Sequence, residues 1–342
     1  MENNTDSPCH LSLQTINKSA KVNVTEDMRL PESIRKALRT RTLNVWEIKP
    51  DQMLTYLEHM FYELDLVTQF KMEPEILKYF LRCVQNNYRD NPFHNFRHGF
   101  CVTQMMYCVI WACELQGCLT AADTVSLMVA SLCHDLDHPG LNNAYQVNAC
   151  TELASRFQNK SPLENHHWAV TSQILSQPQS NILLHADTED VQQILKSIKD
   201  LILATDMSHH SEILRTLQQT EILNLSNAEH VTMLKKSLIK FCDISNEARP
   251  ADQADIWADA LFEEYFIQSD REKAEDLPVT PYMDRDIVSK AESQSSFISF
   301  LIIPLCQTLG KILPQLNTLM MEPLSEAKQR YQEQMEAQKA AL

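Results

Sequence analysis

Apolar residues recur along most of the chain with the three- or four-residue spacing of amphipathic helices. Between Asp51 and Phe61, for example, apolar side chains fall at positions 53, 54, 57, 60 and 61, which predicts a helix with one buried face. Early prolines mark further helix starts, as at Pro74 and Pro162. The pattern predicts helices over residues 51–61, 74 onward, 98–117, 125–138, 142–157, 162 onward, 190–209, 230–246, 255–270, 290–313 and 323–342.

The stretch that organises the rest of the chain follows one apolar run. The Gly-free run over 125–132 leads into His134 and Asp135, then into Asp137 and His138, before a Pro-Gly pair. We expect the helix to continue as far as His138 and to place these four groups at the boundary of the core. Burying them without partners would cost several kcal/mol, and a metal ion is the simplest partner for all of them.

Composition narrows the fold class. Only four glycines occur among 342 residues, far below the usual share of about 7%, and sheets and tight βα loops use glycine freely. No glycine-rich phosphate-binding motif and no internal repeat is present. We therefore predict an all-α protein with a flexible leader over 1–30, a single compact multi-helix domain over 31–335 and a helical tail over 336–342.

Charge and cysteine content bear on partners and compartment. The formal net charge of −15 disfavours nucleic acid polymers and anionic membranes, although a bound metal ion can still attract a small phosphate. The cysteines form no C-x-x-C pair, and several lie on apolar helix faces as expected of reduced thiols: Cys101, Cys108, Cys133 and Cys242. We see neither a signal peptide nor a membrane span of about 18 apolar residues, and we expect a cytoplasmic protein, with a nuclear fraction allowed.

Candidate metal ligands fall on separate predicted helices: His94 with His98, His134 with Asp135, and Asp243. A lone His-x-x-x-His pair is more often structural, and an acid at a helix end, such as Asp243, is ordinarily a local cap. Acids are unfavourable at the C-terminal end of a helix dipole, however, so Asp243 needs a specific partner. Together, two imidazoles and two carboxylates form a donor set suited to zinc or a similar divalent ion.

A two-metal site follows if one carboxylate bridges two ions. The second ion would be harder, such as magnesium, and held largely through water. Two neighbouring ions polarise the attacking and the leaving oxygen of an in-line phosphoryl displacement, and a water that bridges them would be hydroxide near neutral pH. A histidine outside the metal shell is then available as a general acid.

Several stretches resemble the signature of class I cyclic nucleotide phosphodiesterases. Four carry the resemblance, namely His94–His98, His134–Asn143, Ser161–His167 and Cys242–Asn246, and three more strengthen it, namely Leu203–Met207, Glu263–Lys273 and Pro281–Asp286. The resemblance covers residues 30–335 and is greatest to the type 9, cyclic GMP-selective branch. It implies that the domain over 31–335 is catalytic.

The resemblance implies a role for each matching residue. A tight Zn2+ would be bound by His98, His134, Asp135 and Asp243, and Asp135 would also reach a second ion, Mg2+ or Mn2+. The leaving O3′ would be protonated by His94, which Glu264 orients. Metal-bound waters would be held by His138, Glu164 and Thr205. Without the resemblance, Glu164 and Thr205 are equally well explained as an N-terminal helix acid and a helical hydroxyl.

The resemblance also implies a pocket for the base. Phe297 would stack on the purine and Gln294 would pair with its edge, although Gln and Phe at this spacing are common in ordinary helices. The other pocket residues would be Ile244, Leu261 and Tyr265, with Asn246 near the base and Met207 and Tyr282 at the mouth. A glutamine amide presents either a donor or an acceptor, so Gln294 alone does not choose guanine over adenine.

Four positions depart from the pattern expected of the type 9 branch. Ser293 stands where alanine is expected, Ser295 and Ser296 differ as well, and Tyr282 replaces phenylalanine. These changes could alter how Gln294 is held. No position for a metal ligand or for the acid departs from the pattern.

We therefore predict hydrolysis of a 3′,5′-cyclic nucleotide, cyclic GMP above all, to the 5′-monophosphate, which ends cyclic nucleotide signalling; a homodimer is plausible for this family. A cyclic AMP or dual-specificity phosphodiesterase is the first alternative. Another helical His-Asp phosphohydrolase would share the ligands but would need a basic triphosphate-binding patch, which the sequence does not display. A catalytically weak cyclic-nucleotide-binding scaffold would have lost a ligand or the acid, and neither is lost.

Overall fold

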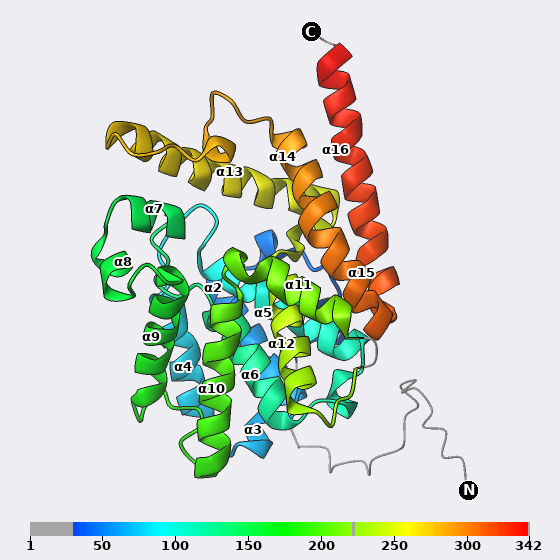
Figure 1. The fold of residues 1–342 in the computed structure, drawn as a ribbon. Helices are drawn as coiled ribbons and strands as arrows, with labels where there is room; N and C mark the ends of the chain where they lie inside the picture. Colours follow the sequence, from blue (N-terminus) through cyan, green and yellow to red (C-terminus); the bar gives the residue numbers. More distant parts are fainter. Residues whose placement is uncertain (1–29, 221–222, 341–342) are drawn as a thin grey trace, which may run out of the picture.

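In a computed structural model, which describes residues 30–220 and 223–340, every described element is helical (Figure 1). The leader expected over residues 1–30 lies outside the described residues, except for residue 30. The elements are α1 (Glu32–Leu38), η2 (Val45–Glu47), α2 (Pro50–Glu63), α3 (Leu66–Gln69), α4 (Pro74–Asn86), α5 (Phe96–Ala112), η3 (Leu115–Gly117), α6 (Ala121–Cys133), α7 (Asn143–Asn148), α8 (Glu152–Arg156), α9 (Pro162–Ser176), α10 (Thr188–Ala204), η4 (Met207–His209), α11 (His210–Gln219), α12 (Ala228–Asp243), η5 (Ser245–Ala248), α13 (Ala251–Ala274), η6 (Pro281–Met283), α14 (Lys290–Phe297), η7 (Ile298–Ile302), α15 (Ile303–Ile312), η8 (Asn317–Met321) and α16 (Glu322–Ala340). The segments η7 and η8 are π-helical, and the other η segments are 3-10 helices.

Three helices form the centre of the fold, because α5, α6 and α12 all pack against one another. The side chains of α5 are buried around almost its whole circumference, as are those of α6 from Thr124 to Cys133. This is the pattern of helices that are surrounded by other helices. Further out, α10 packs along α6 and against α9, while α11 packs on α12. The expected buried thiols Cys101, Cys108, Cys133 and Cys242 are buried and free.

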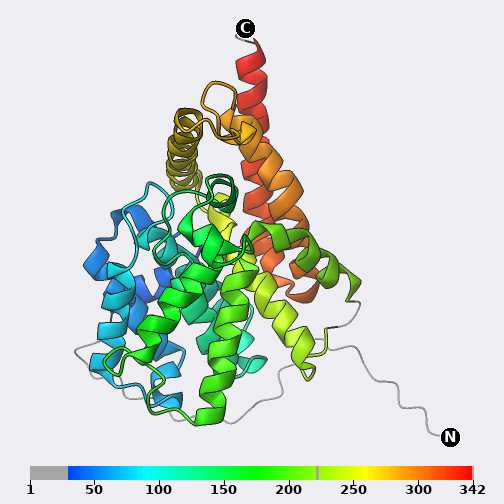
Figure 2. The ribbon, with the colours of Figure 1, turned by 60° about the vertical axis from the view of Figure 1, so that its left-hand side comes forward.

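The C-terminal helices cover one end of this centre. The long helix α13 lies across the top of the molecule in Figure 1, and α14 continues through η7 into α15. The helix α16 packs against α14 and η5, with Leu324, Ala327 and Tyr331 buried. Both views show its last turns extending beyond the other helices (Figure 2). The expected boundary between residues 335 and 336 falls inside α16, which is continuous.

The helix predicted to reach His138 is shorter than expected. The helix α6 ends at Cys133, and His134 is its C-cap, so His138 lies in the turn that follows. The backbone of Asp137 is left-handed, with φ of +59°, which no α-helix accommodates. Its N–H donates instead to the carbonyl of Asn87 at 2.7 Å. A local backbone conformation, invisible to hydrophobic spacing, therefore ends the helix.

Two other helix predictions are also wrong in detail. His94 precedes α5, whose N-cap is Asn95, so His94 and His98 do not share a helical face. The helix predicted over 142–157 is broken into α7 and α8, since Cys150 between them has a left-handed backbone with φ of +50°. A capping side chain at Asn95, and the positive backbone angle at Cys150 followed by the Thr151 cap, decide where these helices begin, and apolar spacing does not.

One helical run is long and apolar enough to cross a membrane by length and composition. It covers Lys290–Ile312, has a mean hydropathy of 1.4, and is 39% buried in its most apolar window. From the sequence we expected no stretch of this kind, so this run was missed. Core helices pass the same test, so this run is weak evidence for a membrane span.

Residues 38–43, which follow α1 and which we name the N-terminal strap, are held by side chains from distant parts of the chain. The six consecutive backbone carbonyls of the strap all accept hydrogen bonds, and the donors are Gln104, Cys108, Arg249 and Gln253. In return, Arg41 donates to the carbonyl of Ala248 at 2.8 Å. These hydrogen bonds connect the strap to α5, to α13 and to Ala248 and Arg249 between η5 and α13.

A buried polar cluster connects the end of α1 with α2 and α5. The Glu63 carboxylate accepts hydrogen bonds from Tyr107 and from Arg39, the latter with Nη2 and Oε2 2.8 Å apart, and Nε2 of His59 lies 3.4 Å from Oε1. Burial acts to raise the pKa of Glu63, but these partners outweigh it and lower the pKa to about 2. The fold therefore stabilises the ionised carboxylate relative to the unfolded chain.

Replacing Glu63 by glutamine is expected to lower the free energy of unfolding at neutral pH by about 1–3 kcal/mol, since charge-assisted hydrogen bonds are lost. The folded pKa of Glu63 lies below its ordinary value, so this contribution is complete above about pH 5 and fades as the pH falls toward 2. Urea unfolding should therefore show that wild type and Glu63→Gln differ less in free energy of unfolding near pH 3 than at neutral pH.

The matched control is Glu75→Gln, because the Glu75 side chain is 83% exposed beside Lys78. This control should change the stability little at either pH. An equal difference between wild type and Glu63→Gln at both pH values would contradict the assigned ionisation.

Candidate active site and metal centre

Four side chains converge where the central helices end. His98 lies in the first turn of α5, His134 and Asp135 directly follow α6, and Asp243 is the last residue of α12. The Nε2 atoms of the two histidines are 3.2 Å apart, and Oδ1 of Asp243 lies 3.1 Å from each. Oδ2 of Asp135 lies 3.0 Å from Nε2 of His134 and 3.4 Å from Nε2 of His98. We call these four residues the metal cluster.

The hydrogen bonding of His134 shows that a cation fits this cluster. Nδ1 of His134 lies 2.9 Å from the carbonyl of Ser131, which only accepts, so this nitrogen carries the proton of a neutral ring. Nε2 then directs a lone pair toward the carboxylates of Asp135 and Asp243. Acceptors that face one another in a buried place repel unless a proton or a cation lies between them. Two nitrogen and two oxygen donors suit zinc or a similar divalent ion.

The carboxylates and the imidazole of the cluster shift one another's pKa values. Burial acts to raise the pKa of Asp135 and of Asp243, but His134 and His98 hold both well below the ordinary value. Burial likewise acts to lower the pKa of His134, and the two carboxylates overcome it and raise that pKa well above the ordinary value. A proton and a divalent ion therefore compete for the same lone pair, and metal binding releases the proton.

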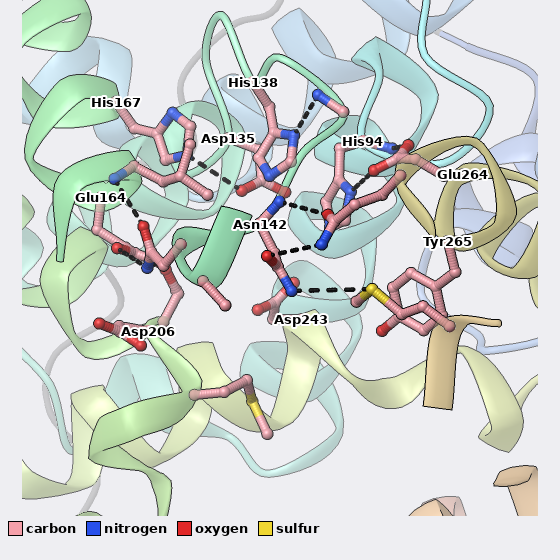
Figure 3. A pocket seen from close by; sticks show the side chains of 18 of the residues that line it. His94, Asp135, His138, Asn142, Glu164, His167, Asp206, Asp243, Glu264 and Tyr265 are labelled. Carbon is pink, nitrogen blue, oxygen red and sulfur yellow. Dashed lines mark hydrogen bonds and ion pairs between the residues drawn. The ribbon is translucent and has the colours of Figure 1, made fainter. Parts of the chain in front are cut away.

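His94 and Glu264 form a charged pair on the opposite side of the cavity from Glu164 (Figure 3). Nδ1 of His94 contacts Oε1 of Glu264, and Oε2 accepts from the backbone N–H groups of Phe93 and His94, both at 3.0 Å. Burial acts to lower the pKa of His94, but Glu264 outweighs it and raises the pKa to about 9. His94 is thus a cationic acid at neutral pH. Glu264 occupies its Nδ1, so Nε2 is the nitrogen left to donate a proton.

His138 stacks on His94 but has the opposite character. The ring centroids are 4.1 Å apart, and the planes differ by 19°. Nδ1 of His138 accepts from the N–H of Gly140 at 3.0 Å, which places the proton of the neutral ring on Nε2. Burial and the charge on His94 lower the pKa of His138 well below its ordinary value. A ring with its proton on Nε2 has no lone pair there for a metal, so His138 acts as a hydrogen-bond donor.

A cavity of about 320 Å³ opens beside the metal cluster. One of its walls is formed by His167, whose Nδ1 lies 2.7 Å from the carbonyl of Leu136. The lone pair on Nε2 of His167 is therefore directed toward Oδ1 of Asp135, 3.7 Å away. Two acceptors that face one gap mark a second place for a cation or for its bound water, and Asp135 is shared between both places.

Glu164 and Thr205 also line this cavity. Asn143 donates through Nδ2 to both carboxylate oxygens of Glu164, at 3.2 and 2.9 Å. Burial, helped by the neighbouring Asp206, nevertheless raises the pKa of Glu164 to about 8. Oγ1 of Thr205 donates to the carbonyl of Ile202 at 2.7 Å, which leaves its oxygen able to accept. The cavity wall thus offers two acceptors, the carboxyl group of Glu164 and the hydroxyl oxygen of Thr205.

Some of the residues expected to form the base pocket line this cavity and others do not. Met207, Tyr265 and Tyr282 line the cavity. The others are absent from its described lining: Gln294, Phe297, Asn246, Ile244 and Leu261.

Gln294 is nevertheless held in a defined orientation. It is 5% exposed, and its Nε2 donates to Oε1 of Glu247 at 3.0 Å. The same oxygen lies 3.3 Å from the hydroxyl of Tyr331, which donates to it. The ionised Glu247 carboxylate holds the amide nitrogen of Gln294 and leaves the amide oxygen free, and burial raises the pKa of Glu247 to about 7.

The sequence model of one family, described as 3′5′-cyclic nucleotide phosphodiesterase, matches residues 93–323, which include the whole metal cluster and the His94–Glu264 pair. The chain belongs to this family. The phosphodiesterase family is metal-dependent, and this chain holds a His-Asp cluster that is able to bind a metal ion. The predicted family is thereby confirmed.

Relatives place this chain in the type 9 branch of the family. The high affinity cGMP-specific 3′,5′-cyclic phosphodiesterase 9A of Homo sapiens is 52% identical over 304 residues, which are 89% of this chain and 51% of that protein. The protein of the same name from Drosophila melanogaster is 42% identical over 313 residues, 91% of this chain and 20% of the relative. The chain thus spans about half the length of the human protein. The predicted branch is confirmed.

A solved structure confirms the all-α fold of this chain. The phosphodiesterase domain of a rhodopsin phosphodiesterase fusion protein from Salpingoeca rosetta superposes with a TM-score of 0.85 at 26% identity. The match covers 89% of this chain and 97% of that chain. The single helical domain predicted from the low glycine content is therefore correct.

Two residues of the site were not singled out from the sequence of this chain. His167 lies at the end of the Ser161–His167 stretch, so the motif itself could have indicated it. Glu247 offers no such signal, because its partner Gln294 is 47 residues away and the contact arises from the packing of α14 and α16 near η5.

We expect Asp243→Ala to lose the tightly bound metal ion. The change removes one anion from the cluster, and the loss of a bound ion should lower the melting temperature by about 5–10 °C. Inductively coupled plasma mass spectrometry after dialysis, with a thermal melt, tests both effects. His94→Ala is the control, since His94 lies outside the cluster and its removal should leave metal content and fold unchanged. A metal-loaded and fully stable Asp243→Ala protein would contradict the assignment.

Proposed function

We propose that this chain hydrolyses a 3′,5′-cyclic nucleotide to the 5′-monophosphate, with cyclic GMP as the preferred substrate, and so ends cyclic nucleotide signalling. The observation that carries the proposal is the convergence of the metal cluster and a cationic acid, His94, on one cavity in a chain of this family. The names of the type 9 relatives, which describe cGMP-specific enzymes, support the choice of base.

We assign Zn2+ to the metal cluster, and Mg2+ or Mn2+ to the gap between Asp135 and His167. Half of the cluster's donors are nitrogen, which suits zinc, whereas the gap has room for the waters that magnesium keeps. When bound, the two cations activate a water and offset the charge that develops on the phosphate. His138, Glu164 and Thr205 present polar groups around this gap, and we assign them the task of holding waters in place.

His94 is assigned as the general acid. In the reaction an oxygen from water bonds to phosphorus while the bond from phosphorus to O3′ breaks, and O3′ leaves with a proton. The ring of His94 is charged at neutral pH, and Glu264 holds its Nδ1, so Nε2 is the atom that gives this proton. A positioned acid typically contributes about 10²–10⁴-fold to the rate. Glu264 also accepts two backbone hydrogen bonds, which keep the pair rigid.

Gln294 is assigned to pair with the base and Phe297 to stack on it. Guanine presents an acceptor at position 6 and a donor at N1, whereas adenine presents a donor and an acceptor at these places. An amide held in one orientation complements only one of the two edges. Nε2 of Gln294 donates to Glu247, and the type 9 relatives are named as cGMP-specific. We therefore propose that Glu247 holds the amide in the orientation that complements guanine.

The decisive measurement is kcat/KM for cyclic GMP and for cyclic AMP side by side, with Mg2+ and trace Zn2+ present. We expect a preference for cyclic GMP of about a hundredfold or more, which corresponds to roughly 3 kcal/mol of transition-state discrimination. In Glu247→Gln the residue at 247 can offer either an oxygen or a nitrogen to Gln294, so the preference should fall by about tenfold. Turnover of neither nucleotide would refute the function, and an unchanged preference in the variant would refute the role of Glu247.

The acid assignment has its own test in the pH dependence of kcat/KM. His94→Ala should lower kcat by about 10²–10⁴-fold while it keeps its metal. Glu264→Gln keeps the ring but removes the carboxylate that raises its pKa. Activity needs the protonated ring and falls above its pKa, so the alkaline limb should move to lower pH in this variant. A limb that stays in place would show that another group donates the proton.

A further inference from the structure

A fully buried lysine lies behind the wall of the cavity. Lys240, on α12, is 0% exposed, although lysine is almost never fully buried without partners. Its Nζ donates to the backbone carbonyls of Thr205 and Asp206, both at 3.1 Å, and to Sδ of Met207 at 3.6 Å. All three contacts are to one short segment, residues 205–207, which we call the corner. None of them is to a carboxylate.

The corner directly follows the C-terminal end of α10, with Thr205 as its C-cap and Met207 as the first residue of η4. The last carbonyl groups of a helix carry partial negative charge, and just beyond this end the carbonyl of Asp206 also accepts from the N–H of His209 at 3.1 Å. Lys240 supplies a hydrogen-bond donor and a positive charge at this place, as basic side chains do at helix C-termini. Burial lowers the pKa of Lys240 to about 8, while Asp243 and Asp206 act in the opposite direction. The lysine thus fastens the end of α10 to α12.

All three corner residues, Thr205, Asp206 and Met207, line the cavity. The carboxylate of Asp206 accepts from the hydroxyl of Ser161 at 2.7 Å, at the start of α9. Glu164, in the first turn of α9, lines the same cavity, and Figure 3 shows it on the same side as Asp206. The corner therefore forms a wall of the same cavity as Asp135 and His167, between which the second cation is assigned.

The position of Lys240 on its helix links this wall to the metal cluster. Lys240 lies three residues before Asp243, which is one turn of α12. A single helix therefore carries a ligand of the first cation and the anchor of the wall around the second. The spacing between the two sides of the cavity is fixed by that helix.

We propose that Lys240 is a positioning residue for the second cation, because it holds the corner so that Thr205 and Asp206 face the gap beside Asp135. This inference rests on the proposed function of the site. Polar groups around the water shell of a metal ion typically change its affinity by about 10–100-fold when they are disturbed. Loss of the anchor should therefore weaken the second cation without removing the first.

Lys240 has two effects on a nearby cation, and they predict opposite results. As a positive charge it repels the cation, so its removal would strengthen binding. As an anchor it holds oxygen atoms in place, so its removal would weaken binding. Lys240 is not part of the described lining of the cavity, and its Nζ is surrounded by carbonyl oxygens. The anchoring effect should therefore dominate.

Lys240→Met tests the proposal, because methionine keeps an unbranched apolar stem and lacks the ammonium group. We expect the Mg2+ concentration for half-maximal hydrolysis of cyclic GMP to rise by about tenfold or more. Binding of Mn2+, followed by electron paramagnetic resonance of the free ion, should weaken by a similar factor. The tightly bound metal, measured by mass spectrometry, should be retained.

Lys235→Met is the matched control. Lys235 is also a buried lysine of α12, 6% exposed, and it donates to Asp123 at 2.7 Å and to Ser197 at 2.8 Å. Neither partner is among the residues that line the cavity. Lys235→Met should lose stability and keep the cation dependence of wild type. An equal loss of Mn2+ binding in this control would show a general effect of instability and overturn the proposal.

The remaining outcomes are also decisive. Unchanged or tighter Mn2+ binding in folded Lys240→Met would overturn the role of Lys240. If that variant does not fold, Lys240→Arg keeps the charge but not the length of the side chain, and it should weaken Mn2+ binding in the same direction; wild-type binding would refute the proposal. A wild-type protein that binds Mn2+ but hydrolyses no cyclic nucleotide would refute the proposed function, while the Mn2+ comparison would still test Lys240.

Discussion

Two carboxylates and two imidazole nitrogens lie within 3.4 Å of a neighbour in the metal cluster, and their facing lone pairs need a proton or a cation between them. Side chains can hold such an arrangement only on rigid supports. Helix axes that pack side by side are about 8–10 Å apart, but three helix ends can meet at one point. The packing of α5, α6 and α12 at the centre of the fold therefore brings the helix ends that carry the four ligands together.

The histidines around the cluster are sorted by the partner of their Nδ1 atoms. A carbonyl at Nδ1 turns a lone pair outward from Nε2, as in His134 and His167. An N–H group at Nδ1 has the reverse effect in His138, and a carboxylate at Nδ1 keeps His94 charged. For four identical rings we therefore assign four different roles: a metal ligand, an acceptor from water, a hydrogen-bond donor and an acid. The backbone around each ring, more than the ring's place in the sequence, decides which it is.

The helices and the metal cluster could both be predicted from the sequence, but each for a different physical reason. A buried helix face must recur every three or four residues, so the helix over 51–61 was recognisable within α2. The donor set was recognisable because His134 and Asp135 follow an apolar run that must be buried. Helix ends were missed where backbone angles decide, as at Asp137. The contact of Glu247 with Gln294 was missed because it arises only from tertiary packing. The catalytic roles of these residues stay predictions.

The N-terminal strap has a consequence for the order in which the chain folds. Its carbonyls bind side chains that lie between 64 and 211 residues further along the chain. During synthesis the strap leaves the ribosome well before its partners, and Arg249 and Gln253 emerge only when most of the domain has been made. Until then, water must satisfy its carbonyls. Docking of the strap is therefore a late, long-range step. It can take place only after the helices that carry its hydrogen-bond donors have folded.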